Sequence, residues 1–386
     1  MAKNPAKIPS AFLAFGSRVR PSPFFEATLR WGCSAYTTYN HFYMPSVYES
    51  PQADYRYLTE AVTLWDVAGE RQTQISGADA AAFVQYLTPR DLSTCTPGRC
   101  RYVLITNAEG GVINDPVLLQ VEENKYWLSA ADTDLTLWCR GVALNSGFDV
   151  EITAPDVSPL QLQGPYAVQV AQALFGDWVL ELKYFHLRQF EFEGMPLVIS
   201  RTGWSGEFGY EIYLCNGEYG DALWERIMQA GEPFGIRPAS PSTIRRLEAG
   251  LLSYGADANE DDTPFHLGMA RLVNLDGGFD FIGKAALQAQ QAAGVSRELV
   301  GVLIEGAPLD TPLVRWWNAY REESEDNGIG KIRSAVYSPT LQKNIGLAML
   351  NKPYQTIGTV FTLQSEYGEQ RQATVTTLPF ISNKTR

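Results

Sequence analysis

The stretch Val198-Ile-Ser-Arg-Thr-Gly-Trp-Ser-Gly-Glu-Phe-Gly-Tyr-Glu-Ile-Tyr-Leu214 predicts a strand, a glycine-rich turn and a second strand. Its glycines permit backbone conformations with positive φ, which tight turns between strands require. Because side chains alternate along a strand, Glu211 and Tyr213 share one face of the second strand. A carboxylate beside a phenol, near the indole of Trp204, would hold a flat heterocycle with N–H donors along one edge. The alternative is a plain hairpin whose glutamate is exposed to solvent.

A second carboxylate is expected in the stretch Gly110-Gly-Val-Ile-Asn-Asp-Pro-Val117. Two glycines allow a tight turn, and Pro116 restricts Asp115 to an extended conformation where a strand begins. Held in this way, Asp115 would accept a hydrogen bond from an amine or orient a cation. The alternative is a turn aspartate that bonds its own backbone.

Aromatic residues are dense between residues 33 and 48. They are Tyr36, Tyr39, Phe42, Tyr43 and Tyr48. An aromatic box holds an onium cation by cation–π attraction, worth about 0.5–2 kcal/mol per contact. The alternative is that these rings form a layer of the core.

Composition excludes several classes of function. The chain has 386 residues, of which 45% are hydrophobic and 19% charged, as expected for a folded protein of two or three domains. A net charge of -12 disfavours nucleic-acid binding, which needs clustered Lys and Arg. We expect no membrane span, because no apolar run approaches roughly 18 residues, and we see no signal-peptide core. Unpaired cysteines and three scattered histidines favour a cytoplasmic protein with reduced thiols and no metal site.

The hydrophobic periodicity along the chain predicts an α+β protein. Beyond Arg297 it predicts only short strands and no helix. Residues 52–65 are expected to form one helix, and Ser240 to cap another that begins at Pro241. The polar loop around Asp257 and Asp262 is expected to be a solvated turn, unless it lines a site.

Six motifs, in this order, resemble those of the glycine-cleavage T-protein (aminomethyltransferase) family. They are Gly-Gly-Val-Ile-Asn-Asp (110–115), Leu-Gln-Gly-Pro (162–165), Ser-Arg-Thr-Gly-Trp-Ser-Gly-Glu-Phe-Gly-Tyr-Glu (200–211), Arg-Leu-Glu-Ala-Gly (246–250), Phe-Ile-Gly-Lys-Ala-Ala-Leu (281–287) and Ser-Pro-Thr-Leu (338–341). Further segments look most like the dimethylsulfoniopropionate demethylase branch of that family. They are Tyr39-Asn-His41, Gly69-Glu-Arg-Gln72, Thr88-Pro-Arg-Asp-Leu92 and Asn114-Asp-Pro-Val117.

The resemblance implies a three-domain cloverleaf around a central folate channel. A split folate-binding domain would comprise residues 1–71 and 158–254. A ferredoxin-like α+β domain would comprise 72–157 and 255–294. A β-rich domain of barrel or jelly-roll type would comprise 295–386.

The same resemblance assigns roles to residues. Glu211 would grip the pterin edge of folate, Tyr213 would contact folate, and Asp115 would lie beside its reacting nitrogen. Trp204 replaces a tyrosine of the family, and Ser129 stands where T-proteins have a folate-contacting Asn.

Ser242 stands where T-proteins have an Arg that binds folate or the partner carrying the lipoyl arm, which argues against ordinary glycine cleavage. Tyr36, Tyr39 and His41 would contact the methyl donor. The basic residue that pairs with a donor carboxylate is left open.

The implied activity is transfer of a methyl group from a small onium donor, such as dimethylsulfoniopropionate, to N5 of tetrahydrofolate. One alternative is a folate-dependent transferase for methylated amines, methoxy-aromatics, or aminomethyl or hydroxymethyl groups. Another is a folate-binding protein without turnover. The small-molecule donor is the expected partner, and a homodimer is left open.

Overall fold

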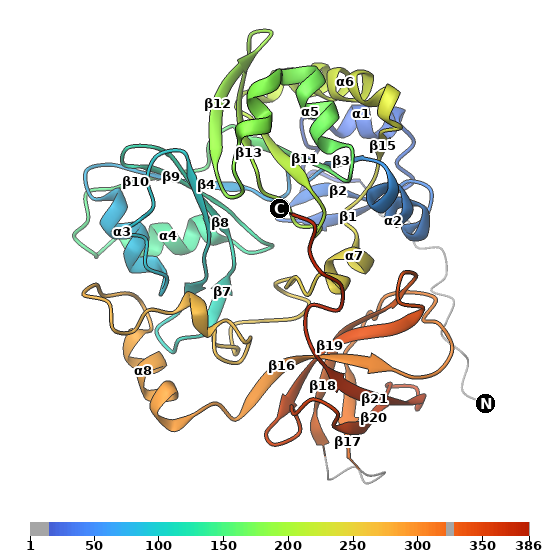
Figure 1. Cartoon of the computed structure of the whole chain (residues 1–386). Coiled ribbons are helices and arrows are strands. Elements are labelled where there is room, and N and C mark those ends of the chain that lie inside the picture. Colours follow the sequence, from blue (N-terminus) through green and yellow to red (C-terminus); the bar gives the residue numbers. More distant parts are fainter. Residues whose placement is uncertain (1–14, 322–327, 386) are drawn as a thin grey trace.

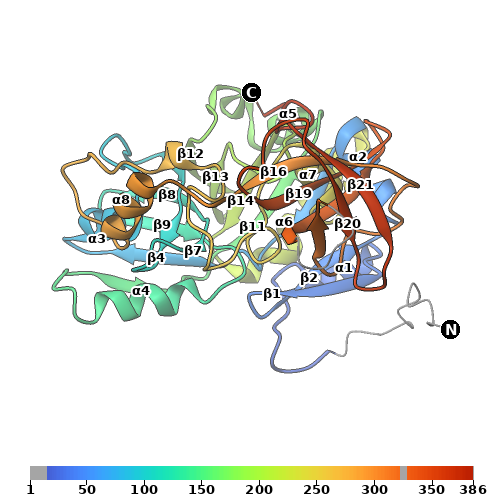
Figure 2. The same ribbon diagram turned by 90° about the horizontal axis from the view of Figure 1, so that it is seen from below.

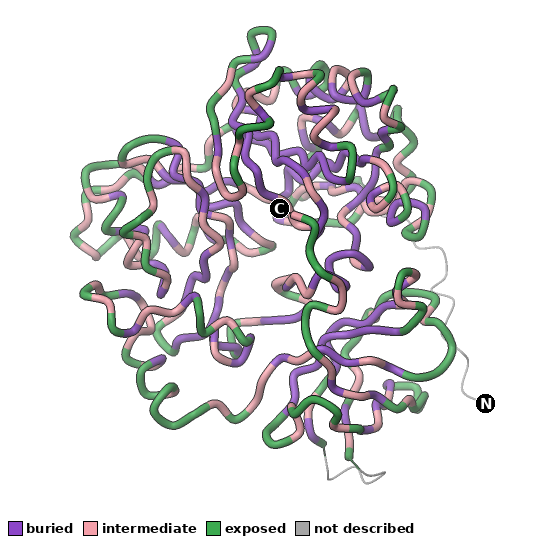
Figure 3. Tube along the Cα trace, viewed as in Figure 1, coloured by how far each residue is buried: buried purple, intermediate pink, exposed green. Residues whose placement is uncertain are grey.

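Three β-structures organise the chain, and each has its own hydrophobic core (Figure 1). The computed structural model describes residues 15–321 and 328–385. Figure 3 shows buried residues along the strands of all three and exposed residues in the outer loops. The predicted mixture of helices and strands is confirmed.

A six-stranded sheet has the order β12-β13-β14-β11-β3-β15. Its strands are β3 (Thr63–Asp66), β11 (Ser158–Gln163), β12 (Leu187–Phe192), β13 (Met195–Ser200), β14 (Gly209–Leu214) and β15 (Arg237–Pro238). One face is covered by α5 (Ala167–Phe175) and α6 (Gly220–Gly231), and α1 (Phe25–Arg30) packs beside α6. The predicted strand, glycine-rich turn and strand are therefore β13, the turn and β14.

The expected helix over residues 52–65 is wrong. Helix α2 (Pro51–Glu60) ends at Glu60, and β3 follows it as an inner strand of the six-stranded sheet. All four residues of β3 are buried, because the sheet has protein on both faces. A strand that is buried on both faces is rich in β-branched and aromatic residues. It lacks the alternation of polar and apolar residues that identifies a half-exposed strand in the sequence.

A five-stranded antiparallel sheet has the order β10-β4-β9-β8-β5. Its elements, with the adjoining hairpin, are β4 (Gln72–Ser76), α3 (Ala80–Leu87), β5 (Arg99–Tyr102), β6 (Ile105–Thr106), β7 (Val112–Asn114), β8 (Val117–Glu122), β9 (Lys125–Ser129), α4 (Leu135–Ala143) and β10 (Glu151–Thr153). Helices α3 and α4 pack on one face. The other face meets β13 and β14, where Trp127 packs against Tyr213.

The third β-structure is a closed six-stranded barrel with the order β16-β19-β18-β17-β20-β21, which confirms the predicted barrel. Its strands are β16 (Arg297–Ile304), β17 (Trp317–Tyr320), β18 (Gly328–Ser338), β19 (Lys343–Asn351), β20 (Val360–Gln364) and β21 (Gln370–Thr376). Helix α8 (Lys284–Ala293) precedes it. The exact boundaries predicted for the three domains stay a prediction.

The remaining elements are short. They are the hairpin β1 (Ala35–Tyr39) and β2 (Phe42–Val47), helix α7 (Thr243–Glu248), and the 3-10 helices η1 (Asp177–Glu181), η2 (Gly217–Tyr219), η3 (Glu232–Phe234) and η4 (Ala270–Leu272). Ser242, not Ser240, caps α7 by accepting a bond from Arg245 N at 3.2 Å. The Ser240 hydroxyl instead donates to Ser46 O at 2.9 Å.

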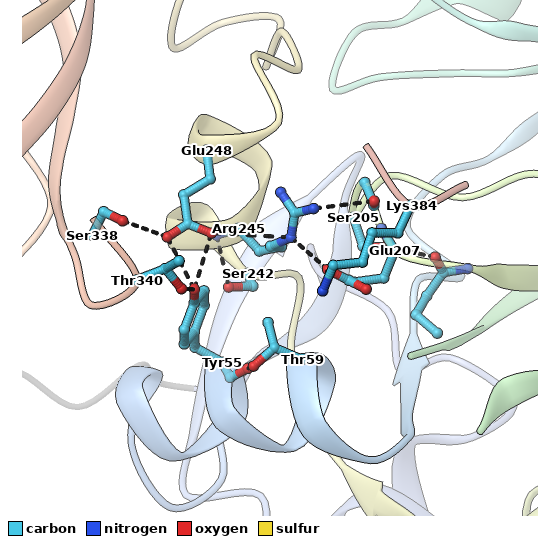
Figure 4. Close-up of polar contacts among 12 residues, drawn as sticks. Tyr55, Thr59, Ser205, Glu207, Ser242, Arg245, Glu248, Ser338, Thr340 and Lys384 are labelled. Carbon is cyan, nitrogen blue, oxygen red and sulfur yellow. Dashed lines mark hydrogen bonds and ion pairs between the residues drawn. The ribbon is translucent and has the colours of Figure 1, made fainter. Parts of the chain in front are cut away.

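Helix α7 lies between the six-stranded sheet and the barrel in Figure 1, and Figure 2 shows it beside β19, which it contacts together with β18. Buried polar contacts fix it there (Figure 4). Arg245 Nε lies 2.8 Å from Glu207 Oε1, in the glycine-rich turn. Glu248 accepts bonds from Tyr55 of α2 at 3.0 Å and from Ser338 of the barrel at 2.5 Å. One buried network of hydrogen bonds and ion pairs thus connects α7 with the glycine-rich turn, helix α2 and the barrel.

The segment after β21 returns to the glycine-rich turn. Ile381 N donates to Glu248 O at 2.8 Å, and Lys384 N donates to Gly206 O at 2.7 Å. Arg201 donates to Thr385 O at 2.7 Å. Residues 381–385 therefore complete the surroundings of the turn that carries Trp204.

Candidate active site

Glu211 lies at the middle of the six-stranded sheet, where it pairs in register with Gln161 of β11 and Ser200 of β13. It is 3% exposed. Its carboxylate accepts bonds from Gln161 Nε2 at 2.9 Å, from Tyr213 OH at 2.9 Å, and from the Thr202 hydroxyl. Burial raises the pKa of Glu211, and these hydrogen bonds oppose that shift.

Tyr213 shares a face of β14 with Glu211, as the alternation of the strand predicts. Its ring is fully buried, 6.2 Å from the ring of Trp127, and its hydroxyl is bonded to Glu211. The structure therefore supports a role in orienting the carboxylate. Direct contact of Tyr213 with folate stays a prediction.

Glu70 is a second carboxylate beside Glu211, and sequence reasoning did not single it out. Gln161 links the two, because its Nε2 also lies 3.5 Å from Glu70 Oε1. Burial, then the charges of Glu211 and Asp115, raise the pKa of Glu70 well above its ordinary value. No cation pairs with Glu70 or Glu211 within residues 15–321 and 328–385. A ligand with N–H donors or a positive charge would relieve this repulsion.

Asp115 follows β7 and accepts a bond from Tyr102 OH at 2.9 Å. It is partly exposed, so it faces accessible space. Burial raises its pKa to about 7, the Tyr102 bond opposes the shift, and the charge of Asp257 adds to it. Asn114 fixes the backbone here by donating to Ala131 O at 3.1 Å. The predicted turn aspartate is thus a positioned, titratable group.

Among the aromatic residues of the 33–48 stretch, Tyr39 packs against Gly69, the residue before Glu70. A side chain at Gly69 would meet Tyr39 Cβ at 3.2 Å, so glycine there lets the tyrosine pack against the backbone before Glu70. Burial, then the charges of Glu70 and Asp115, raise the pKa of Tyr39 well above normal. Asn40 anchors this end of the hairpin by donating to Gly69 O at 3.0 Å.

Tyr36 and His41 lie elsewhere. Tyr36 bonds Thr28 at 2.7 Å, and its ring packs 5.1 Å from Phe25. His41 is exposed at the turn of the hairpin, with Nε2 3.7 Å from Asp134 Oδ1. The structure therefore groups Tyr39 with the carboxylates, and groups neither Tyr36 nor His41 with them. Contact of those two residues with a donor stays a prediction.

Ser129 and Trp204 are held by neighbours. The Ser129 hydroxyl accepts from Gln72 Nε2 at 2.9 Å, and the same amide donates to Glu70 O at 2.7 Å. Trp204 Nε1 donates to Leu252 O at 2.9 Å, and its backbone N–H donates to the Gln161 amide at 3.3 Å. Gln161 therefore links Trp204 to the Glu211 carboxylate, and Gln72 links Ser129 to the backbone of Glu70. Contact of Ser129 and Trp204 with folate stays a prediction.

The polar loop after α7 is not a solvated turn at Asp257 and Asp262, which are 0% exposed. Asp257 pairs with Arg246, whose guanidinium also lies 5.8 Å from the ring centre of Trp204. Asp262 pairs with Arg333 of the barrel. Arg246 of the preceding helix and Arg333 of the barrel compensate the buried charges. Asp257 thereby holds the guanidinium that lies behind the Trp204 indole.

The candidate site combines carboxylates, phenols and an indole. Among the residues that the structure describes, the one cationic group beside these side chains is Arg246, which lies behind the indole of Trp204. It suits a flat ligand with N–H donors at Glu211 and a positive charge between Glu70, Asp115 and Tyr39. Across the described part of the chain, no group of His, Cys, Asp and Glu side chains forms a metal site. Nor does any described helix have the length and apolar character needed to cross a membrane.

Comparisons with known proteins agree over nearly the whole chain. Residues 24–277 match the GCVT N-terminal domain, and residues 297–381 match the glycine cleavage T-protein C-terminal barrel domain. The dimethylsulfoniopropionate demethylase DmdA of Ruegeria pomeroyi is 37% identical over 351 residues, covering 91% of this chain and 94% of the relative. An aminomethyltransferase of Caldanaerobacter subterraneus is 33% identical over 321 residues, covering 82% of this chain and 84% of that protein.

A solved structure shows the same fold. The crystal structure of glycine cleavage system aminomethyltransferase T from Bartonella henselae superposes with a TM-score of 0.83 at 23% identity, covering 95% of this chain and 99% of that one.

Proposed function

Because the chain belongs to the glycine cleavage T-protein family, we propose that it moves a methyl group from a small onium donor, such as dimethylsulfoniopropionate, to N5 of tetrahydrofolate. The chain is an enzyme that transfers one-carbon units, and tetrahydrofolate is its acceptor. The donor and the roles of individual residues are the proposal.

The residues fit tetrahydrofolate. Glu211 is a buried carboxylate held by Gln161, Thr202 and Tyr213, and it can accept bonds from the amino edge of a pterin. When bound, tetrahydrofolate supplies N5 as the nucleophile. Asp115 would lie beside that nitrogen and stabilise positive charge that develops there, which is the usual role of a preorganised charge in catalysis.

One observation carries the onium donor: Glu70 and Asp115 raise the pKa of Tyr39, and no cation offsets either carboxylate within the described chain. The raised pKa values of Glu70 and Asp115 show that their ionised forms lack a compensating charge, so a cation bound beside the Tyr39 ring would stabilise those ionised forms. Transfer from a sulfonium breaks the C–S bond and leaves its electron pair on sulfur. The leaving thioether is neutral, so no general acid is required.

A second candidate is a transferase for methoxy-aromatics, methylated amines, or aminomethyl or hydroxymethyl groups. The 33% identity with an aminomethyltransferase favours it. The pKa of about 7 at Asp115 also favours it, since a neutral ether donor requires a proton source.

A donor panel tests the proposal. The purified chain is incubated with tetrahydrofolate and, separately, dimethylsulfoniopropionate, glycine betaine and a methoxy-aromatic, and 5-methyltetrahydrofolate is quantified by mass spectrometry. We expect product with the sulfonium and at most slow product with the ether. Product from the methoxy-aromatic alone would overturn the onium assignment. Product from glycine betaine but not from dimethylsulfoniopropionate would keep the onium class and overturn the sulfonium as the donor.

A further inference from the structure

A cavity of about 360 Å³ is lined by none of the carboxylates of the candidate active site. We call it the arginine pocket, because Arg20, Arg71 and Arg140 line it. Arg20 precedes the first hairpin, Arg71 precedes β4, and Arg140 lies on α4. The pocket thus brings cations together from three separate segments.

The positive charge of the arginine pocket is poorly compensated. Asp134 is the one carboxylate among the residues that line it, and its Oδ1 lies 3.7 Å from His41 Nε2. Within residues 15–321 and 328–385, the guanidiniums of Arg20 and Arg71 make no hydrogen bond or ion pair. Arg140 gives Nε to Ile152 O at 3.1 Å.

Mutual repulsion accompanies this arrangement. Burial, then the charge of Arg20, lower the pKa of Arg71. The charge of Asp134 opposes this shift, and the charge of Arg140 adds to it. The clustering occurs in a chain whose net charge is -12, where carboxylates are in excess to pair with surface cations. Three guanidiniums gathered around a single carboxylate favour a further anion between them.

Neutral donors complete the lining. The hydroxyls of Thr73 and Thr136 lie 2.7 Å apart at the wall, and Thr133 contributes a third hydroxyl. Thr136 belongs to the first turn of α4, whose N-cap residue Asp134 makes no side-chain capping bond. The amino end of a helix adds a favourable potential for negative charge.

We propose that the arginine pocket binds a small anion with two or more negative charges, of the phosphate or polycarboxylate class. The planar guanidinium matches the oxygens of both groups in bidentate fashion. The volume lies within the usual range for small-molecule sites, about 300–1,000 Å³. None of the residues assigned to folate lines this site. His41, expected from the sequence to contact the methyl donor, does line it, but the structure does not group His41 with the carboxylates of the candidate active site.

The pocket is nevertheless connected to the candidate active site. Ala130 and Thr133 line it, and Asn114, next to Asp115, donates to the Thr133 hydroxyl at 2.7 Å. Asn40 bonds Ala130 O at 3.3 Å. A bound anion would therefore contact the segment that positions both Tyr39 and Asp115.

Calorimetry on the full chain tests the proposal, with inorganic pyrophosphate and citrate as probes at low ionic strength. We compare the natural chain with Arg71→Gln and Arg140→Gln, and use Arg56→Gln as the matched control. Arg56 is an exposed arginine of α2 outside the pocket, so its loss changes the net charge equally. We expect affinity to fall about ten-fold or more in each pocket variant and to change by less than about two-fold in the control.

Thermal unfolding gives a second readout and checks folding. Pyrophosphate or citrate should raise the unfolding temperature of the natural chain by mass action, and should do so far less in Arg71→Gln. Without an anion, Arg71→Gln should unfold at the same or a higher temperature, because it relieves repulsion. The tighter probe identifies the class of anion. No binding of either probe, or binding that survives both pocket substitutions, would overturn the proposal.

Discussion

The hydroxyl of Tyr102 donates a 2.9 Å hydrogen bond to Oδ2 of Asp115. This contact acts against burial, the larger effect, and leaves the pKa of Asp115 at about 7. Asp115 is therefore poised to change its charge near neutral pH, and its phenol partner sets where that change occurs.

The pH dependence of activity should report Asp115. We expect kcat/KM for one-carbon transfer to rise with pH through about 7, because the ionised carboxylate stabilises positive charge at the acceptor nitrogen. In Asp115→Asn that rise should be absent and the plateau rate lower. Initial rates between pH 5.5 and 8.5 measure both. An unchanged profile in the variant would remove Asp115 from the chemistry.

Tyr102→Phe should move the same profile to higher pH. The substitution deletes the bond that favours the ionised carboxylate, so the pKa of Asp115 should rise further. Tyr86→Phe, on the remote helix α3, is the control, and it should leave the profile in place. A shift to lower pH in Tyr102→Phe contradicts the role given to the phenol.

The titration of Asp115 should also affect the free energy of unfolding, which should fall with rising pH where the activity rises. Because the folded-state pKa of Asp115 lies above its ordinary value of 3.8, its protonated form is favoured by the fold. The resulting stability is full below the ordinary value and is lost as pH rises through about 7. Denaturant titrations should show the natural chain losing stability relative to Asp115→Asn across that window. Equal slopes for the two proteins would argue that Asp115 is not desolvated.

Glu211→Gln should weaken binding of tetrahydrofolate about ten- to a hundred-fold, the effect of losing a charge-assisted hydrogen bond in a buried site. Calorimetric titration measures the affinity. Glu191→Gln is the matched control, because Glu191 is exposed on β12 of the same sheet. If both variants bind tetrahydrofolate as tightly as the natural chain, the pterin edge does not contact Glu211.

Arg246→Met should lower the free energy of unfolding by about 3–5 kcal/mol, because it leaves the buried Asp257 without its cation. Arg226→Met breaks an exposed pair with Glu193 and should change stability little. Denaturant titrations of the two variants give the comparison. Comparable losses would mean that burial does not set the strength of these pairs.

Short sequence patterns were enough to predict part of the candidate site. Strand alternation predicts that Glu211 and Tyr213 share a face, and their hydrogen bond confirms it. The two glycines and Pro116 predict a turn before Asp115. The phenol that bonds Asp115 was not predictable, because Tyr102 reaches it through the register that pairs Tyr102 with Val117.

Long-range neighbours account for what sequence reasoning missed. Glu70 stands in a short motif, and its relevance comes from Gln161, 91 residues away. Asp262 belongs to a polar loop that reads as solvated, and Arg333, 71 residues away, makes its burial possible. Thr63–Asp66 reads as the end of a helix because only the completed sheet covers both of its faces.

The return of residues 381–385 to the glycine-rich turn has a consequence for biosynthesis. Thr385 meets Arg201 across 184 residues of chain, after the barrel strands between them. The ribosome therefore releases β13 and β14 long before it delivers the segment that closes over them. Until residues 381–385 have emerged, a nascent chain lacks the contacts that Thr385 and Lys384 make with Arg201 and Gly206, so the turn that carries Trp204 stays uncovered on that side.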